Sequence, residues 1–236
     1  MKNTQINRAA RLLIIKSKDY ILNSSFLFIF FVVYGISLKA GFFDKLSEDL
    51  LLMFLWALIF GIGIIISNSM IVDITFKDKL KKRLEFFLAN GINPKKYIQA
   101  YSIEMWRLSS IIPYLIFLLT YFIYNFSIDL KWILLLFIST IGLNYFIILS
   151  LNLLALDRSN YKLFKMILFS ITTVIIYMLG NFSKQILIFL SNKNINLIFL
   201  LIKINLSLIL AIGILSFIKL NKISKEKIIT KEGRWT

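Results

Sequence analysis

Few side chains in this sequence could carry out chemistry. The chain has no His and no Cys, so the commonest general base, the commonest neutral metal ligand and any thiol nucleophile are missing. Among the polar side chains within its long apolar runs, four are candidates for function: Asn144, Asn152, Lys203 and Asn205. An unpaired amide is costly at lipid depth, so the Asn side chains are expected to bond neighbouring helices or, alternatively, to line a substrate pathway. The amine of Lys203 is expected to reach the headgroups or, as the second choice, to line a pathway. We expect no catalytic residue, no metal site and no cofactor.

A basic segment between two apolar runs is the other candidate for function. Asp73–Arg107 carries eight Lys and Arg residues. Its apolar residues Leu80, Leu84, Phe87 and Leu88 recur at the spacing of one helical stripe. Aromatic side chains in such a charged stretch indicate a contact surface rather than a solvated loop, because exposed apolar patches favour association.

The same segment contains residues that stop and restart a helix. Asn90-Gly91 is expected to end the first helix, because Gly readily adopts the left-handed geometry found past a helix end. Asn93-Pro94 predicts a turn, and Lys95–Tyr101 predicts a second helix after it. The segment is therefore expected to form a short helix, a sharp turn and a second helix.

The surrounding sequence is typical of an integral membrane protein. Hydrophobic residues make up 58% of the chain and the mean hydropathy is +0.79, well outside the range of soluble domains. An apolar run of roughly 18 residues crosses a bilayer core of about 30 Å. We therefore expect one all-α membrane domain over residues 1–236, with six spans at Tyr20–Leu38, Leu50–Val72, Leu108–Phe126, Trp132–Leu156, Phe164–Phe182 and Leu197–Leu220.

The density of Lys and Arg alternates between successive loops. Five precede Tyr20, eight lie in Asp73–Arg107, three in Asp157–Lys165 and six from Lys219 onward, against two, one and two in the intervening loops. Because cytoplasmic loops carry the excess of Lys and Arg, both termini and Asp73–Arg107 are predicted to be cytoplasmic. This distribution is typical of a topological charge bias, with some attraction to anionic lipid, and it disfavours nucleic-acid binding as the reason for the positive charge.

Two further parts of the chain are assigned to the cytoplasmic side. Residues 1–19 are predicted to form an amphipathic helix on the membrane surface, and residues 221–236 a cytoplasmic tail. The apolar side of the N-terminal helix is formed by Ile6, Ala9, Ala10, Leu13 and Ile14.

Small residues and a proline predict details of helix packing. Ala57, Gly61 and Gly63 form a face on which another backbone can approach closely. Pro113 is expected to kink the third span and to move Ile112 out of helical geometry.

The basic segment also carries a resemblance to a known family. The stretch LEFFLANGINPKKYIQAYSI before a third span resembles the cytoplasmic loop of six-helix ABC exporter permeases, a superfamily that includes bacitracin-resistance, lantibiotic-immunity, sodium-exporting and peptide-exporting permeases. That loop has a glutamate, two or three bulky apolar residues, a turn of small residues and Pro, and a Lys. Length, span number, charge topology and the amphipathic N-terminal helix extend the resemblance to the whole chain. The matching residues here are Glu85, Phe86, Phe87, Leu88, Gly91, Pro94 and Lys95.

The resemblance implies a coupling role for these residues and for Leu84 and Asn90. In the superfamily this loop contains a coupling helix that docks into a groove of a separate ATP-binding subunit. This chain has no GxxxxGK[ST] motif, so ATP and Mg²⁺ are expected on that partner rather than on this chain. The implied complex contains two ATP-binding subunits and a second permease, identical or related. It would lie in the bacterial cytoplasmic membrane and export hydrophobic or amphipathic substrates such as antimicrobial or cytolytic peptides.

Two other functions fit the same sequence. One is a permease of the haem-exporter or cytochrome-assembly kind, against which the lack of His counts because no imidazole could bind haem iron. The other is a membrane scaffold or channel that works without ATP, and it predicts no ATPase partner.

Overall fold

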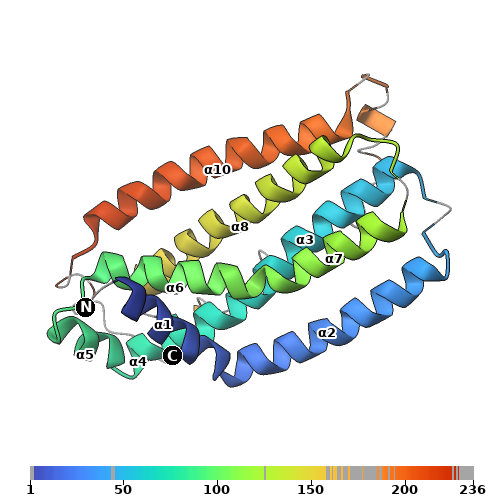
Figure 1. Ribbon diagram of the computed structural model, residues 1–236. Coiled ribbons are helices and arrows are strands. Elements are labelled where there is room, and N and C mark those ends of the chain that lie inside the picture. Colours follow the sequence, from blue (N-terminus) through green and yellow to red (C-terminus); the bar gives the residue numbers. More distant parts are fainter. Residues whose placement is uncertain are drawn as a thin grey trace.

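The structure, a computed structural model, is a bundle of long helices (Figure 1). It describes residues 3–43, 46–124, 126–157 and 195–224, together with scattered positions between 160 and 193 and residues 226 and 228. The labelled helices are α1 (Asn3–Ile15), α2 (Lys18–Lys39), α3 (Glu48–Met70), the π-helix η1 (Ile71–Phe76), α4 (Lys77–Leu80), α5 (Arg83–Ala89), α6 (Pro94–Ser109), α7 (Ile111–Ile123), α8 (Leu130–Asp157) and α10 (Leu197–Lys222).

Within the part of the chain that the structure describes, five helical stretches are long and apolar enough to cross a membrane. They coincide with five of the six predicted spans, so the prediction of an all-helical membrane protein is confirmed to that extent. The predicted span Phe164–Phe182 and the predicted tail of residues 221–236 lie largely outside the described residues. The five stretches are Lys18–Lys39, Glu48–Leu80, Pro94–Ile123, Leu130–Asp157 and Leu197–Lys222.

The second and third spans extend further than the hydropathy pattern predicts. The helix of α3 continues through η1 and α4 to Leu80, whereas the predicted span ends at Val72. The third span begins at Pro94 rather than Leu108. Charged residues interrupt an apolar run in the sequence, but they do not end a helix that has one face packed against other helices. The helix α6 packs against α1 and α8. Most of the predicted loop Asp73–Arg107 is therefore continuous with the two spans.

A break at Ser110 separates α6 from α7. Pro113 has no N–H, so it cannot donate to the carbonyl of Ser109, four residues earlier, as a regular helix would require. The prediction of a distortion near the proline is confirmed in this form. The prediction that Ile112 leaves helical geometry is wrong, because Ile112 lies within α7.

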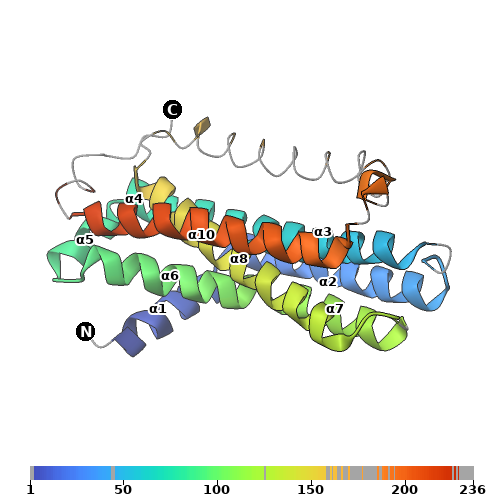
Figure 2. The same cartoon turned by 90° about the horizontal axis from the view of Figure 1, so that it is seen from above.

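The helices α3 and α8 lie at the centre of the bundle. The helix α8 packs against α3, α6 and α10, while α3 also packs against α2 and α7 (Figures 1 and 2). The outer faces of α2 and α10 consist of exposed apolar side chains, an arrangement that requires lipid or another chain as a neighbour. These side chains include Leu22, Phe26, Ile29, Ile36, Leu210, Leu215 and Phe217.

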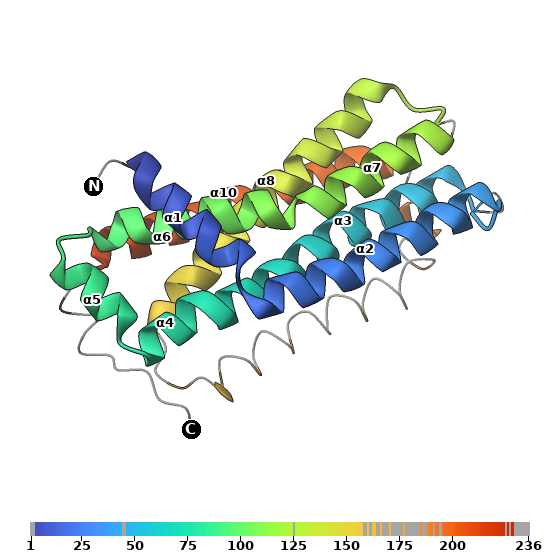
Figure 3. The ribbon, with the colours of Figure 1, turned by 60° about the horizontal axis from the view of Figure 1, so that its bottom comes forward.

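The N-terminal helix α1 crosses over α6 (Figure 3). Ile6, Ala10 and Ile14 are spaced by four residues and are buried. Of the helix predicted for residues 1–19, the structure has Asn3–Ile15, and a second helix begins at Lys18. The three buried residues of the first helix pack on the bundle. Leu12 and Leu13 remain exposed on α1.

Two hydrogen bonds connect the basic segments at one end of the bundle. The amine of Lys79 on α4 donates to the carbonyl of Leu156 at the end of α8, at 2.6 Å. The amine of Lys95 at the start of α6 donates to Asn221 Oδ1 at the end of α10, at 3.3 Å. We call this the basic end; it also holds α1 and α5, and the connection between α7 and α8 lies at the opposite end (Figure 1).

Candidate functional site

A short helical hairpin, α4 and α5, projects from the basic end (Figure 1). The chain reverses at Lys82, which has a left-handed φ of 56° that is uncommon for a residue other than Gly. At the end of α5, the N–H of Gly91 donates to Leu88 O and that of Ile92 to Phe87 O, both at 3.2 Å. This pair of bonds is the Schellman motif, and Gly91 has the φ of 81° that it requires. The predicted helix stop at Gly91 is confirmed.

The predicted turn after α5 is also confirmed. Asn93 caps α6, because its Oδ1 accepts a hydrogen bond from the N–H of Lys95 at 2.9 Å, and Pro94 occupies the first turn. The side chain of Asn90 donates to the carbonyl of Phe86 at 2.8 Å. Hydrogen bonds therefore hold both sides of the α5–α6 connection.

The apolar stripe of α5 faces the chain's own core. Leu84 and Leu88 are 1% and 2% exposed, and the ring of Phe87 lies 6.1 Å from that of Tyr97 on α6. Leu80 lies on α4, before the turn, so the predicted stripe is not one continuous helix. The sequence predicted this stripe as the surface for a partner, yet Leu84 and Leu88 are already covered. Periodicity identifies a buried face but does not tell which molecule buries it.

The opposite side of α5 is open to solvent. Phe86 is 67% exposed, and Lys81, Lys82, Arg83 and Asn90 are also exposed. We call these five residues the Phe86 surface. Among the other predicted coupling residues, Gly91 is exposed, Glu85 and Lys95 are half-buried and Pro94 is buried.

A buried carboxylate attaches the hairpin to the bundle. Asp78 on α4 is 6% exposed, and its Oδ2 accepts a hydrogen bond from the hydroxyl of Tyr97 at 3.4 Å. The guanidinium of Arg83 lies 3.6 Å from Asp78 Oδ1. With the bond from Lys79 to Leu156, these contacts join α4 to α5, α6 and α8. Sequence reasoning missed Asp78, although it is the only acidic residue between Lys77 and Arg83.

An apolar groove of about 360 Å³ lies where α1, α5 and α6 meet. Ile6 and Leu13 of α1 line it together with Phe86, Phe87 and Tyr97. The ring of Phe86 therefore belongs both to the exposed basic surface and to a recess that could hold an apolar side chain.

Asn205 on α10 bonds two neighbouring helices. It is fully buried, and its Nδ2 donates to Ser139 Oγ and Thr140 Oγ1 on α8, both at 3.0 Å. Its Oδ1 accepts from Trp56 Nε1 on α3 at 3.2 Å. The side-chain amide is thus bonded at both its nitrogen and its oxygen, as interhelical bonding predicts.

Asn152 on α8 does the same nearer the basic end. Its Nδ2 donates to Ser102 Oγ on α6 at 3.0 Å, and its Oδ1 accepts from Thr75 Oγ1 on η1 at 2.6 Å. A purely apolar junction here would leave three helices free to slide, whereas these bonds fix their register.

Asn144 makes fewer hydrogen bonds than the other two Asn side chains, and it limits the size of the residue at position 63. Its Nδ2 donates to the carbonyl of Ile59 at 3.4 Å, while its buried Oδ1 has no partner within the described chain. A Cβ added to Gly63 would lie 2.3 Å from that Nδ2, but one added to Gly61 would meet nothing within 4 Å. A close neighbour is present at Gly63, but it is the side chain of Asn144 rather than a backbone, and the prediction of a close approach is wrong at Gly61.

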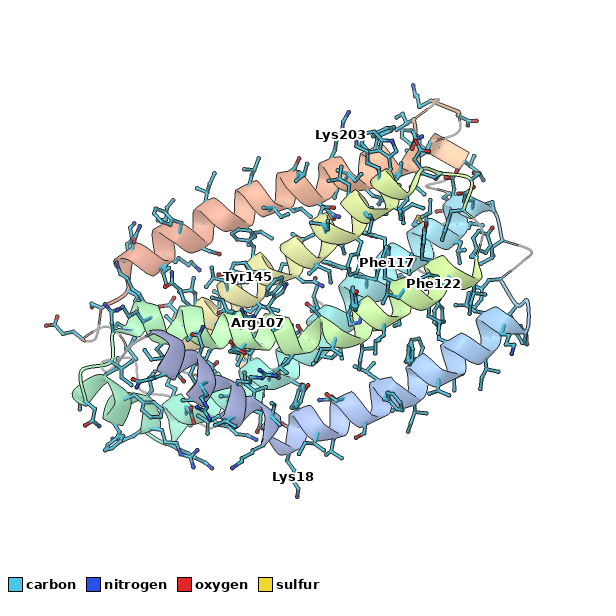
Figure 4. All side chains as sticks on the ribbon, viewed as in Figure 1. Lys18, Arg107, Phe117, Phe122, Tyr145 and Lys203 are labelled. Carbon is cyan, nitrogen blue, oxygen red and sulfur yellow. The ribbon has the colours of Figure 1, made fainter. Side chains whose placement is uncertain are left out.

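Lys203 lies on the outer surface of α10, near the helix start, and points away from the bundle (Figure 4). This placement suits an amine that extends to the headgroups. Within this one chain it lines no described cavity.

An ion pair within the third span was missed by sequence reasoning. Arg107 lies 3.0 Å from Glu104, and the two side chains are 61% and 4% exposed. The indole of Trp106 donates to the carbonyl of Ile141, near the middle of α8, at 2.8 Å. Arg107 consequently lies well away from both ends of the bundle (Figure 4). The hydropathy pattern hid this pair because it placed the start of the span at Leu108.

Comparisons of the chain with protein-family models, with curated proteins and with solved structures find no match. The function is therefore argued from the geometry of the basic end and from the sequence resemblance described above.

Proposed function

We propose that this protein is the membrane-spanning subunit of an ATP-driven exporter, and that its α4–α5 hairpin binds a separate ATP-binding subunit. The observation that carries the proposal is the Phe86 surface: a large aromatic side chain on α5, 67% exposed, next to exposed cations on a hairpin that is fixed to the bundle. An exposed Phe next to several exposed cations, beyond the apolar spans, favours a protein partner.

The hairpin is suited to transmit movement because it is attached to several spans. It is covalently continuous with α3, through η1, and with α6. The contacts of Asp78 with Tyr97 and of Lys79 with Leu156 add α6 and α8. A displacement of α5 by closing ATP-binding subunits would therefore reach the centre of the bundle and could shift it between two packed states.

The π-helix η1 lies between the hairpin and the span. Such i→i+5 segments are rare and occur often at functional positions in helices. Its Thr75 is bonded to Asn152, so a change in η1 geometry would be communicated to α8.

The subunit composition that we propose for the complex is based on the resemblance of the loop sequence to ABC exporter permeases. Two copies of the ATP-binding subunit would assemble with this chain and a second permease copy or relative in the bacterial cytoplasmic membrane. The cargo proposed is a hydrophobic or amphipathic molecule, such as an antimicrobial or cytolytic peptide. The exposed apolar faces of α2 and α10 offer surface for lipid and for the second permease.

The proposal can be tested by purification of the tagged chain from membranes of its source cells after reversible crosslinking. We expect a Walker-motif ATPase in comparable amount and ATP hydrolysis that vanadate inhibits. The substitution Phe86→Glu should lower ATPase recovery about tenfold or more, as for an aromatic anchor at the centre of an interface.

Phe42→Glu provides the matched control. Phe42 is 76% exposed and follows α2 at the opposite end, so the same substitution there should leave ATPase recovery unchanged. Crosslinked wild-type protein without any ATPase would contradict the proposal and favour the ATP-independent scaffold or channel. Full recovery with Phe86→Glu would exclude the Phe86 surface as the docking site.

A further inference from the structure

Arg107 presents a positive charge on the lateral surface of the bundle. Its side chain is 61% exposed, whereas the carboxylate side chain that pairs with it, Glu104, is 4% exposed. The negative partner is thus covered and the guanidinium faces outward. Arg has five N–H donors in a fixed fork, and one bond to Glu104 Oε1 leaves donor capacity on the exposed side.

The position of this charge makes it unusual. Trp106 bonds the carbonyl of Ile141, and its ring contacts Tyr145 at 5.8 Å, both in the middle part of α8. In a bundle whose long apolar helices cross a bilayer, a lateral surface midway along those helices faces hydrocarbon. Ionisable side chains there are costly and mark binding sites or pathways.

An apolar groove begins beside the guanidinium. Its volume is about 370 Å³, within the range of small-molecule sites. It follows the break between α6 and α7, where Ile111 and Tyr114 are half exposed on its wall and Phe137 of α8 lines the other side. Among the described residues that line it, Arg107 is the only charged one.

We propose that this groove binds a single-chain amphiphile with one acidic group, which enters from the bilayer. The guanidinium of Arg107 would hold the carboxylate through charge-assisted hydrogen bonds. The apolar chain would lie along Trp106, Ile111, Tyr114 and Phe137. A neutral amphiphile would leave the exposed donors of the Arg107 guanidinium without an anionic acceptor beyond Glu104, and a soluble anion would leave the groove empty, so the site selects for both properties at once.

The test uses the full-length chain in phosphatidylcholine nanodiscs, without any ATP-binding subunit, so its outcome is independent of the proposed docking site. The probes are palmitic acid carrying a photoreactive diazirine and palmityl alcohol carrying the same group. Peptide mapping by mass spectrometry should locate acid labelling on α6, α7 and α8 at the groove. We expect the alcohol to label there about tenfold less, and Arg107→Gln to reduce acid labelling about tenfold or more.

Lys203→Gln is the matched control, because Lys203 is an exposed cation in another span and lies away from the groove. It should label like the wild type. Ile111→Trp narrows the groove and keeps Arg107, so this variant should also lose labelling by the acid. It provides a second test if Arg107→Gln does not fold. Equal labelling by acid and alcohol, or wild-type labelling of Arg107→Gln, would overturn the proposal. If the acid does not label the groove and two chains crosslink to each other at α6, the proposal is also overturned. That result would indicate that a second copy of the chain occupies the groove.

Discussion

At the scale of single residues, Gly63 shows how a side chain on one helix limits its neighbour on another. The amide of Asn144 occupies the space that a Cβ at position 63 would need, 2.3 Å away. Asn144 cannot easily retreat, because its Nδ2 bonds Ile59 O and it is 1% exposed. Gly61, two residues earlier, has open space around it, so two glycines of one predicted face have different roles.

We therefore expect Gly63→Ala and Gly61→Ala to differ in their effect on stability. Gly63→Ala should lower the free energy of unfolding by about 1–3 kcal/mol, because the new methyl group displaces Asn144. Gly61→Ala should be neutral or stabilising by up to about 1 kcal/mol, through helix propensity alone. Unfolding in mixed micelles measures both.

A double substitution makes this prediction sharper. Asn144→Ala removes the side chain that the new methyl group would meet, so Gly63→Ala should cost much less in that background. Equal stabilities of the two single glycine variants would contradict the close contact between α3 and α8.

At the scale of an element, α5 is held in place by backbone geometry at its ends as well as by its buried stripe. Gly91 has a φ of 81°, and a Cβ there would meet nothing within 4 Å. The only cost of a side chain at this position is therefore the left-handed backbone itself. A substitution at Gly91 therefore tests the conformation of the helix end without introducing a steric clash.

Gly91→Ala is expected to loosen α5 without changing its surface. The left-handed backbone costs an L-residue roughly 1–2 kcal/mol, so the amides of Gly91 and Ile92, which form the Schellman bonds, should exchange hydrogen about ten times faster. Hydrogen–deuterium exchange with mass spectrometry measures this locally.

The reverse change at the other end of the helix serves as a comparison. Lys82 has a φ of 56°, so Lys82→Gly should leave exchange in α5 unchanged or slower. If α5 transmits the movement of a bound ATPase, Gly91→Ala should also reduce transport while ATPase binding persists. Unchanged exchange in Gly91→Ala would show that the Schellman bonds do not hold the hairpin.

At the scale of the whole molecule, the two ends of the bundle differ in charge and in construction. The basic end holds α1, α4 and α5 and most of the described Lys and Arg residues. At the opposite end, the carboxylate of Glu48 accepts hydrogen bonds from the N–H groups of Ser127 and Ile128, at 2.8 and 3.2 Å. Positive charge concentrated at one end of the spans favours an orientation with that end in the cytoplasm.

Labelling of single cysteines can test this orientation, because the natural chain contains no Cys. Lys96 and Asp129 are exposed at the basic and the opposite end respectively. With a membrane-impermeant maleimide on intact cells, Asp129→Cys should be labelled and Lys96→Cys should react only after permeabilisation. The opposite pattern would reverse the orientation and remove the Phe86 surface from the side where ATP is found.

The sequence alone was sufficient for the features that depend on local physical chemistry. Apolar runs predict the five described helical stretches that are long and apolar enough to cross a membrane, because the length of a bilayer core is fixed. Gly91 and Asn93 predict the end of α5 and the start of α6, because the left-handed backbone and the side-chain cap are properties of these residue types. The stripe of Leu84 and Leu88 correctly predicts a buried face.

What covers each face was decided by the tertiary structure. Leu84 and Leu88 pack on this chain's own helices, which leaves Phe86 as the exposed aromatic residue of α5. Arg107 lies beside the middle of α8 because the helical stretch of the third span begins at Pro94, before the start at Leu108 that hydropathy predicts. The periodicity of apolar residues and the local charge depend on residues that are close together in the sequence. Burial depends on contacts between residues that are far apart in the sequence, and those contacts form only when the helices pack.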